Sequence, residues 1–190
     1  APSVVDVRDL GDDKHLEVTM HLGTFGSIID QVERARGLFG LRHDSSAAEQ
    51  ALRHDALLGP RIRRRPGLRV AGAWDRFETA VRIIVGQQVS VAGASTVCGR
   101  IAARFGEEVH VDLPGGLRYL FPTASALSGA DLCGIGMPDA RARTVVAYAE
   151  AVAAGDLDLS DAVSLDVACS RLEALPGIGP WTSNLIAARA

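Results

Sequence analysis

The sequence predicts a mainly α-helical fold with a β-hairpin at its N-terminal end. From residue 27 onward, apolar residues recur at helical spacing through most of the chain, which indicates a series of amphipathic helices. Residues 4–22 differ, because two segments rich in β-branched residues flank the turn Gly11–Asp12–Asp13. A lone hairpin is marginally stable, so we expect this one to pack on another element or to belong to a larger sheet that this chain does not show in full.

The composition is that of a packed globular protein. Apolar residues make up 47% of the 190 residues, and the net charge is −3. The sequence shows no apolar run of membrane length and no signal peptide, and it begins as if inside a domain. Cys98, Cys133 and Cys169 form no C-x-x-C pair, so we expect a reducing compartment and neither a disulfide framework nor a metal site built on cysteines.

Two domains are expected. The first comprises residues 1–23 and holds the strands, over 4–8 and 16–22. Residues 24–190 begin with helices over 27–39 and 47–54, and Ser45 or Ser46 is suited to cap the second of these. The last helix lacks a C-cap glycine, so this helical domain is expected to be incomplete at its C-terminal end.

Nearly all the basic residues are arginine, and Lys14 is the single lysine among 20. One cluster contains Arg61, Arg63, Arg64, Arg65 and Arg69. The negative net charge argues weakly against a general nucleic-acid binder. The cluster itself fits a solvated loop and a set of phosphate contacts equally well.

The strongest helical pattern begins at Asp75. Its apolar face comprises Phe77, Ala80, Val81 and Ile84. Gly86–Gln87–Gln88 interrupts the pattern before a second helix, which is expected from Val89 to about Phe105. Two interpretations of the paired glutamines remain open. They form a polar connection that satisfies helix ends, which composition favours, or a polar finger that reaches a ligand.

The next segments are a loop with a short strand over 107–116 and two further helices. Thr123 is expected to cap a short helix over 124–127. The turn Gly134–Ile135–Gly136 precedes a long helix over 139–154, and we interpret it as a helix–helix corner rather than a phosphate site. The inward face of the long helix comprises Ala142, Val145, Val146, Ala149 and Val152.

A second glycine turn, between Leu175 and Thr182, predicts a helix-hairpin-helix over about residues 167–190. The turn itself is Pro176, Gly177, Ile178, Gly179 and Pro180. The first proline ends the preceding helix, and the second suits the first turn of the next. The glycines permit positive φ and the close approach of a ligand. Backbone N–H groups at the start of the second helix bind anions such as phosphate, so the motif is suited to hold a DNA backbone without recognising bases.

Five segments occur in the order and at the spacings of the AlkA-type DNA-3-methyladenine glycosylase II family, which belongs to the helix-hairpin-helix base-excision DNA glycosylases. They are Asp75–Glu78, Ile83–Val91, Phe121–Thr123, Gly136–Pro138 and Leu175–Asn184. Residues 65–69 and the N-terminal hairpin also resemble this family. The resemblance implies a helix-hairpin-helix DNA glycosylase fold, whose helical lobes enclose a base pocket. It also implies that the hairpin in residues 1–23 is the remnant of an N-terminal β-sheet domain whose start is absent.

The resemblance also assigns roles to residues in both loops. Gln88 takes the position of the wedge that fills the gap left by a flipped base. Gln87, Trp181 and Leu185 correspond to the substrate pocket, where an indole attracts a positively charged alkylated purine. Without the resemblance, Trp181 would be assigned to the core. DNA contacts are implied for Pro176, Gly177, Ile178, Gly179, Pro180, Thr182 and Gln88.

The resemblance implies a monofunctional glycosylase, which removes the base without cleaving the DNA strand. Trp181 stands where strand-cleaving relatives carry a lysine that forms a Schiff base, and Lys14 lies far away in the hairpin. The four-cysteine iron–sulfur loop of other relatives is absent from the sequence. The catalytic aspartate of monofunctional members would lie beyond Ala190, so we expect no catalytic residue in this chain and no turnover by it.

The resemblance implies a bacterial cytoplasmic, nucleoid-associated monomer that removes alkylated bases from double-stranded DNA by N-glycosidic hydrolysis after base flipping. No membrane contact and no cofactor are expected, apart from a structural Na⁺ or K⁺ ion. The main-chain carbonyls of Glu173, Leu175 and Ile178 correspond to positions that hold this ion. The alternative is a non-catalytic helix-hairpin-helix DNA-binding module.

Overall fold

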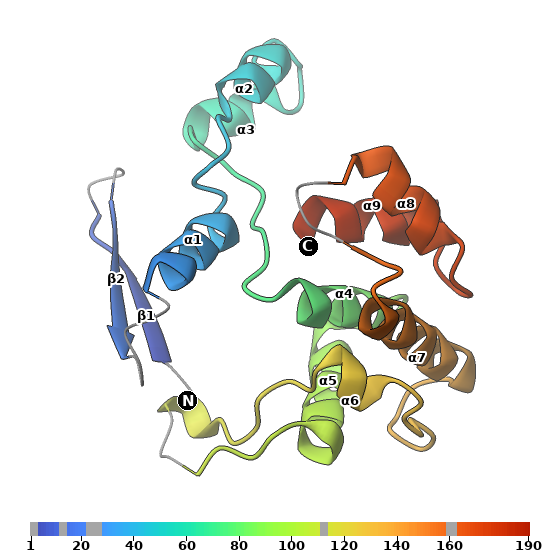
Figure 1. Ribbon diagram of the computed structural model, residues 1–190. Helices are drawn as coiled ribbons and strands as arrows, with labels where there is room; N and C mark the ends of the chain where they lie inside the picture. Colours follow the sequence, from blue (N-terminus) through green and yellow to red (C-terminus); the bar gives the residue numbers. More distant parts are fainter. Residues whose placement is uncertain (1–3, 12–14, 22–27, 111–113, 159–162) are drawn as a thin grey trace.

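The computed structural model describes residues 4–11, 15–21, 28–110, 114–158 and 163–190 (Figure 1). A two-stranded antiparallel sheet is followed by helices, as the sequence predicts. The elements are β1 (Val4–Asp9), β2 (Leu16–His21), α1 (Ile28–Leu38), α2 (Ser46–Leu52), α3 (Gly59–Arg64), α4 (Arg76–Val85), α5 (Val91–Phe105), η2 (Pro114–Gly116), α6 (Ala124–Leu127), α7 (Asp139–Ala154), α8 (Leu165–Glu173) and α9 (Pro180–Arg189).

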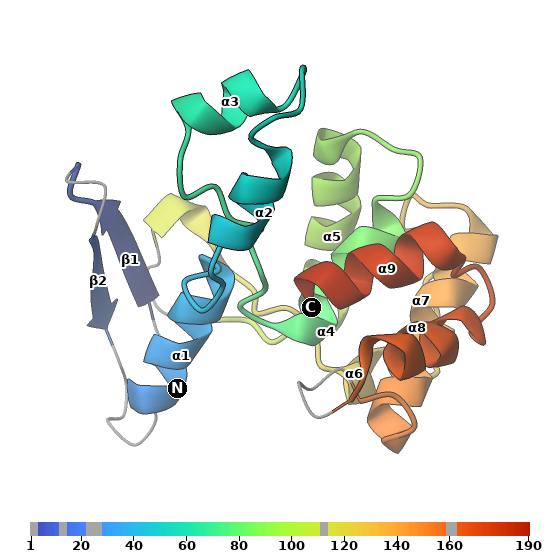
Figure 2. The same ribbon diagram turned by 90° about the horizontal axis from the view of Figure 1, so that it is seen from above.

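The hairpin pairs β1 with β2 over their full lengths, from Val4 opposite His21 to Asp9 opposite Leu16. Alternation along the strands leaves Val5, Val7 and Met20 half-buried. Figures 1 and 2 show α1 lying beside this hairpin and apart from the larger body formed by α4–α9. Among the described residues before Arg76, Ala35 is the one buried apolar side chain, so this part contributes little to the main core.

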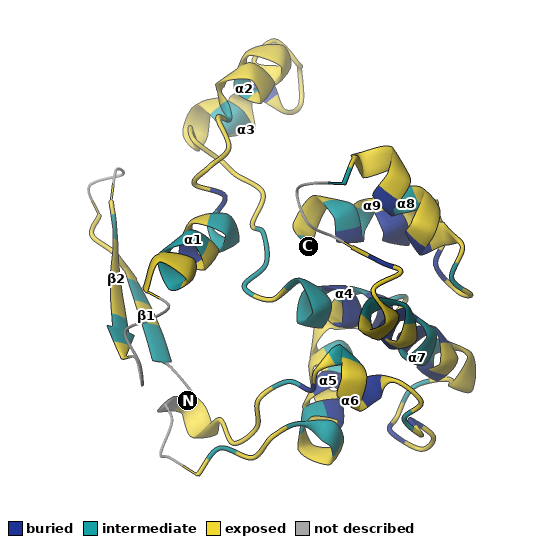
Figure 3. Ribbon diagram, viewed as in Figure 1, coloured by how far each residue is buried: buried dark blue, intermediate teal, exposed yellow. Residues whose placement is uncertain are grey.

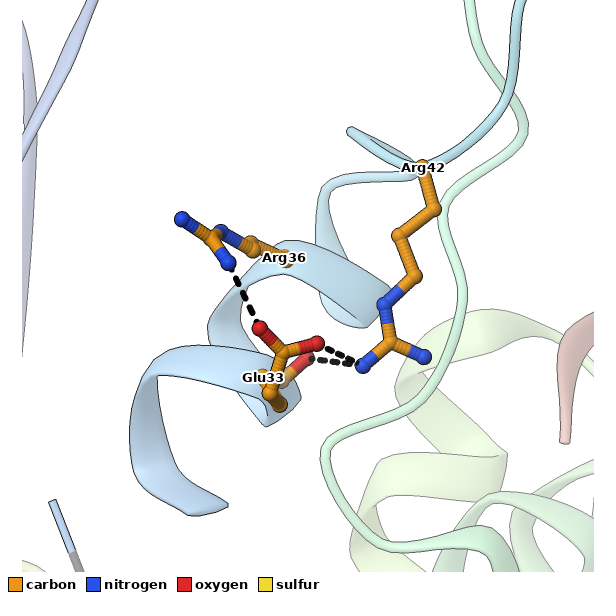
Figure 4. A network of polar contacts seen from close by, with 3 residues as sticks. All are labelled: Glu33, Arg36 and Arg42. Atoms are coloured by element: carbon orange, nitrogen blue, oxygen red, sulfur yellow. Dashed lines mark hydrogen bonds and ion pairs between the residues drawn. The ribbon is translucent and has the colours of Figure 1, made fainter. Parts of the chain in front are cut away.

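The chain leaving α1 is tied back to that helix by an ionic network. Glu33 accepts hydrogen bonds from Arg36, at 2.6 Å, and from Arg42 (Figure 4). Both hydrogen bonds lower the pKa of the Glu33 carboxyl group, and the one from Arg36 makes the larger contribution. The network orients the start of the segment that continues into α2.

Two local expectations between α1 and α4 are wrong. Ser45 does not cap α2, because its backbone is helical and its hydroxyl contacts Glu49 instead; Asp44 accepts the hydrogen bond from the Ser46 N–H. The arginine cluster is partly helical rather than a loop, since α3 contains three of its five members. A proline in the first turn of α3 stabilises this short helix, whose apolar pattern is too short to be seen in the sequence.

The core lies among the helices from α4 to α9. α4 packs against α5, α7 and α9, while α6 packs on α7 and α8 packs on α9. Fully buried side chains include Ile84, Ile101, Leu127, Leu172 and Ile186. Burial of such a side chain contributes about 1.5–3 kcal/mol, so this body holds most of the folding energy. Figure 3 shows buried positions concentrated in these helices.

Most boundaries in the helical body match the sequence predictions. Thr123 caps α6 by accepting a hydrogen bond from Ala126 N–H, at 3.2 Å. The start of α5 is a correction: the helix begins at Val91 rather than Val89, because Ser90 accepts the Gly93 N–H and acts as its N-cap. The strand expected in 107–116 is a single bridge between Glu108 and Tyr119.

The turn Gly134–Ile135–Gly136 is a helix–helix corner, as predicted. Ile135 is buried in the core, and its carbonyl accepts a hydrogen bond from Arg100, at 3.1 Å. Arg104 donates to the carbonyl of Cys133, so two arginines of α5 brace the corner. In α7, three of the five expected inward residues are buried, whereas Val146 and Val152 are half-buried. Among the described helices, none is long and apolar enough to cross a membrane.

Candidate nucleic-acid interface

The turn between α8 and α9 is anchored to α7 through Gly177. This glycine has φ 82°, and a β-carbon placed on it would lie 2.2 Å from the Thr144 hydroxyl oxygen. Thr144 is buried and donates to the Ala140 carbonyl, so it cannot move aside easily. Ile178, one residue later, is buried in the core. The turn is therefore held by the close packing of Gly177 against Thr144 and by the burial of Ile178 in the core.

Gly179 is exposed like Gly177, but it faces open space instead of a neighbouring side chain. Its backbone is extended, and a β-carbon there would meet nothing within 4 Å. Among the described residues, no hydrogen bond uses the N–H groups of Gly177, Gly179 or Trp181. Pro180, which follows, has no N–H. The start of α9 thus presents unpaired donors beside an open backbone, which is the arrangement that binds an anion.

The first turn of α9 is fixed to its neighbours by buried hydroxyl groups. Ser183, which is fully buried, donates to the Glu173 carboxylate at 2.6 Å and joins α9 to α8. Thr182 is also buried, and its hydroxyl accepts a hydrogen bond from the Gln87 side-chain amide at 3.0 Å. Asn184 donates to the Pro180 carbonyl at 2.7 Å. These hydrogen bonds tie the start of α9 to α8 and to the loop between α4 and α5.

The two glutamines of the loop between α4 and α5 have different environments. The Gln87 amide donates to Thr182 and approaches the Gly177 carbonyl at 3.3 Å, so it joins this loop to the hairpin. Gln88 is exposed and has φ 55°, the one positive φ among the described non-glycine residues. Such a conformation is uncommon outside glycine and concentrates at functional sites. One glutamine thus fixes the loop, and the other is free to meet a ligand.

The Gln87–Thr182 hydrogen bond is expected to stabilise the protein measurably. Gln87→Ala should lower the free energy of unfolding by about 1–2 kcal/mol, because a buried hydroxyl loses its donor. Paired with Thr182→Val in a double-mutant cycle, it should show a coupling energy of about 1 kcal/mol in urea denaturation. Gln88→Ala is the matched control and should stay within about 0.5 kcal/mol of wild type. Additive effects of the two substitutions would contradict a stabilising bond.

The three residues expected to form the base pocket differ in exposure. Trp181 lies at the N-terminal end of α9 and Leu185 lies further along it, whereas Gln87 lies in the loop between α4 and α5. Trp181 is 70% exposed, so it is not a core residue. Leu185, one turn further along α9, is half-buried, as is Gln87. A cleft of about 470 Å³ lies near the other end of α9 and is lined by Arg42, Arg76 and Arg189 among others, not by Trp181.

The expected cation ligands are main-chain carbonyls around the turn. The Leu175 carbonyl accepts the Ile178 N–H at 3.3 Å and retains one lone pair, and no hydrogen bond among the described residues uses the carbonyls of Glu173 or Ile178. No cluster of three or more histidine, cysteine or acidic side chains suited to a metal occurs within the described ranges. Lys14 lies outside those ranges.

The fold is that of the helix-hairpin-helix DNA glycosylases. The 3-methyladenine DNA glycosylase from Archaeoglobus fulgidus superimposes with a TM-score of 0.76 at 23% identity, over 97% of this chain and 62% of that one. The Clostridium acetobutylicum 8-oxoguanine glycosylase/lyase, solved with double-stranded DNA, gives a TM-score of 0.71 at 20% identity, over 96% and 61%. At this level of identity the likeness defines the fold alone.

Sequence relatives narrow the assignment. Residues 1–75 match the AlkA N-terminal domain family. DNA-3-methyladenine glycosylase 2 of Escherichia coli is 41% identical over 129 residues, or 66% of this chain and 44% of the relative. A Mycobacterium tuberculosis protein described as "Probable bifunctional transcriptional activator/DNA repair enzyme AlkA" is 36% identical over 175 residues, or 92% and 35%. The chain is thus similar to AlkA-type proteins over most of its own length, and it spans about a third to a half of the length of these relatives.

Sequence reasoning missed three features of this site. The hydrogen bond from Gln87 to Thr182 joins residues 95 positions apart, and a single sequence carries no signal for it. The contrast between the crowded Gly177 and the open Gly179 was also hidden, because both residues have the same chemistry. The left-handed conformation of Gln88 had a weak signal, namely its place in a short connection between two apolar helices.

Proposed function

We propose that the full-length gene product is a monofunctional base-excision DNA glycosylase that removes alkylated bases of the 3-methyladenine type. The observation that carries the proposal is the hydrogen bond between Gln87 and Thr182. It couples the exposed Gln88 loop, which is suited to enter a base stack, to the helix start that presents Trp181 and free N–H groups. The turn that contacts the DNA backbone and the residues that contact the base are thereby joined by a direct hydrogen bond.

The proposed reaction follows from these positions. The N–H groups of Gly177, Gly179 and Trp181 bind a DNA phosphate, and Gln88 occupies the gap in the duplex. The extruded base stacks on Trp181, whose indole face attracts its positive charge. The C1′–N bond then breaks, the base leaves neutral, and water adds to C1′ with loss of a proton. The family's stabilising carboxylate is not among the residues of this chain.

Two further parts of the proposal concern a bound monovalent cation and the oligomeric state of the protein. The carbonyls of Glu173, Leu175 and Ile178 would hold a Na⁺ or K⁺ ion, which would supply positive charge for binding a DNA phosphate. Replacing K⁺ with a bulky organic cation at equal ionic strength should then weaken DNA binding. The enzyme is proposed to act as a monomer on nucleoid DNA in the bacterial cytoplasm, and light scattering of the DNA-free and DNA-bound forms tests the stoichiometry.

Gly179→Ala separates DNA binding from folding. The added methyl group meets no protein atom, so the free energy of unfolding should change by no more than about 0.5 kcal/mol. It does occupy the open space beside the free N–H groups, so affinity for duplex DNA should fall at least about fivefold. Fluorescence anisotropy with a duplex oligonucleotide measures this change.

Release of 3-methyladenine from methylated duplex DNA tests the reaction itself. Release by the full-length gene product, reduced in Gly179→Ala, supports the glycosylase. Duplex binding without any release would instead establish a non-catalytic helix-hairpin-helix module. Unchanged affinity in Gly179→Ala would show that the hairpin is not the phosphate site.

A further inference from the structure

A second basic surface lies on the segment that carries α2 and α3, away from the hairpin. We call residues 44–69 the basic arm. It contains six arginines and three carboxylates, although the whole chain has a net charge of −3. Nearly all of its side chains are exposed, and Figure 3 shows α2 and α3 projecting from the rest of the molecule. The proposed glycosylase function makes no use of this surface.

The carboxylates of the basic arm are used to hold its backbone. Glu49 accepts hydrogen bonds from the Gly67 N–H at 2.7 Å and from the Ser45 hydroxyl at 2.9 Å, which closes the base of the arm. Asp55 accepts the N–H groups of Leu57 and Leu58, both at 2.8 Å. These hydrogen bonds lower the pKa of both carboxyl groups, with the backbone donors making the largest contributions. In the part of the chain that the structure describes, neither carboxylate forms an ion pair with an arginine of α3.

The guanidinium groups of the arm, in contrast, are largely unpaired. Arg63 donates to the Arg53 carbonyl at 3.0 Å and braces α3 against the end of α2. Arg61, Arg64 and Arg65 are exposed and make no hydrogen bond or ion pair within the described ranges. Their i, i+3 and i, i+4 spacings place them on one side of α3 and its C-cap. Like charges at this spacing repel, so the free protein gains nothing from their clustering.

The arrangement fits a row of phosphates. A guanidinium group presents a planar set of donors that matches the oxygens of a phosphate. Figure 2 shows α3 and the loop between α4 and α5, which carries Gln88, on the same upper side of the molecule. A ligand that reaches both must be long, and the part that meets the three arginines must be negatively charged. A DNA duplex has this shape and charge, and it is also the proposed ligand of the hairpin.

We propose that Arg61, Arg64 and Arg65 form a second DNA-phosphate contact, which the basic arm makes with the same duplex that the hairpin holds. This inference rests on the proposed function, since it takes duplex DNA as the ligand. The arm would add affinity without base specificity, because phosphates carry no sequence information. Its internal hydrogen bonds keep the three side chains on one preformed surface.

The test replaces the three arginines together in the full-length gene product. The Arg61→Gln, Arg64→Gln, Arg65→Gln variant removes the charges and retains residues of similar helix propensity. The matched control carries lysine at the same three positions. Binding to an undamaged duplex is measured by anisotropy across a salt series. Removing one arginine–phosphate interaction should reduce the slope of log Kd against log salt by about 0.9.

We expect the glutamine variant to lose about two to three units of this slope and to bind at least about tenfold more weakly at low salt. The lysine variant should keep the slope, and both variants should unfold at the wild-type midpoint. An unchanged slope in the glutamine variant would overturn the proposal and indicate another ligand, such as an acidic protein surface. A reduced slope in the lysine variant would overturn it as well.

Failure of the proposed glycosylase function would give a different set of results. If the wild-type protein neither binds duplex DNA nor releases a base, the proposed glycosylase function fails, and this inference fails with it. If the wild type binds DNA and Gly179→Ala weakens binding, while the glutamine variant binds normally, only the inference about the basic arm is wrong.

Discussion

Gly177→Ala is expected to lower the free energy of unfolding by about 2–4 kcal/mol. Two effects add. The residue has φ 82°, where a side chain is strained, and its new methyl carbon would lie 2.2 Å from the Thr144 hydroxyl oxygen. Thr144 is buried, β-branched and hydrogen-bonded to the Ala140 carbonyl, so it resists displacement. Urea denaturation of the full-length gene product measures the loss.

A double-mutant cycle separates the two effects. Thr144→Ala removes the clashing oxygen, so in the Gly177→Ala background it should restore about 1–2 kcal/mol, while the backbone strain remains. Gly179→Ala is the control, because the same substitution two residues away meets no protein atom. Equal destabilisation by both glycine substitutions would show that contact with α7 does not fix the turn.

Trp181→Ala is expected to impair excision strongly and stability hardly at all. The side chain is 70% exposed, so its removal should change the free energy of unfolding by no more than about 0.5–1 kcal/mol. Loss of stacking on the extruded base should cost about 1–3 kcal/mol of binding free energy for any base. For a positively charged base, loss of the cation–π attraction adds about 0.5–2 kcal/mol, or roughly a further 2–30-fold in kcat/KM.

Comparing two substrates isolates the contribution of charge. Excision of 3-methyladenine, which is cationic in DNA, should fall more than excision of neutral hypoxanthine. Trp181→Phe keeps a stacking surface with a weaker attraction for cations, so it should recover hypoxanthine excision more fully. Equal losses for the two substrates would show that Trp181 does not recognise the charge. No loss of excision for either substrate would show that Trp181 is not part of the base pocket.

The helical body could be predicted from the sequence because its signals are local and strong. Long apolar repeats identify α4, α5 and α7 to within two residues, and Thr123 acts as the expected cap. α3 was missed, since its helical residues include three arginines and one half-buried isoleucine. That helix depends on a proline in its first turn, the Asp55 hydrogen bonds and the contact with Arg53. Such interactions leave no periodic pattern of apolar residues in the sequence.

The candidate site shows a similar limit. The motif Leu175–Thr182 identified the turn, but two glycines two residues apart look alike in a sequence. Their difference comes from Thr144, which lies far away in the chain and is placed beside one of them by the packing of α7. The two neighbouring glutamines likewise differ only because Gln87 meets Thr182 across the interface of α4 and α9.

The sequence by itself determined the helix class, the hairpin motif and the tryptophan in its second helix, because residue type and spacing set backbone preference and side-chain chemistry. Tertiary structure decided which glycine is crowded, which glutamine is exposed, and that Trp181 lies on the surface rather than in the core. It also decided that the carboxylates of the basic arm bind backbone and leave three arginines free. Those outcomes depend on contacts between residues distant in the chain, which packing alone brings together.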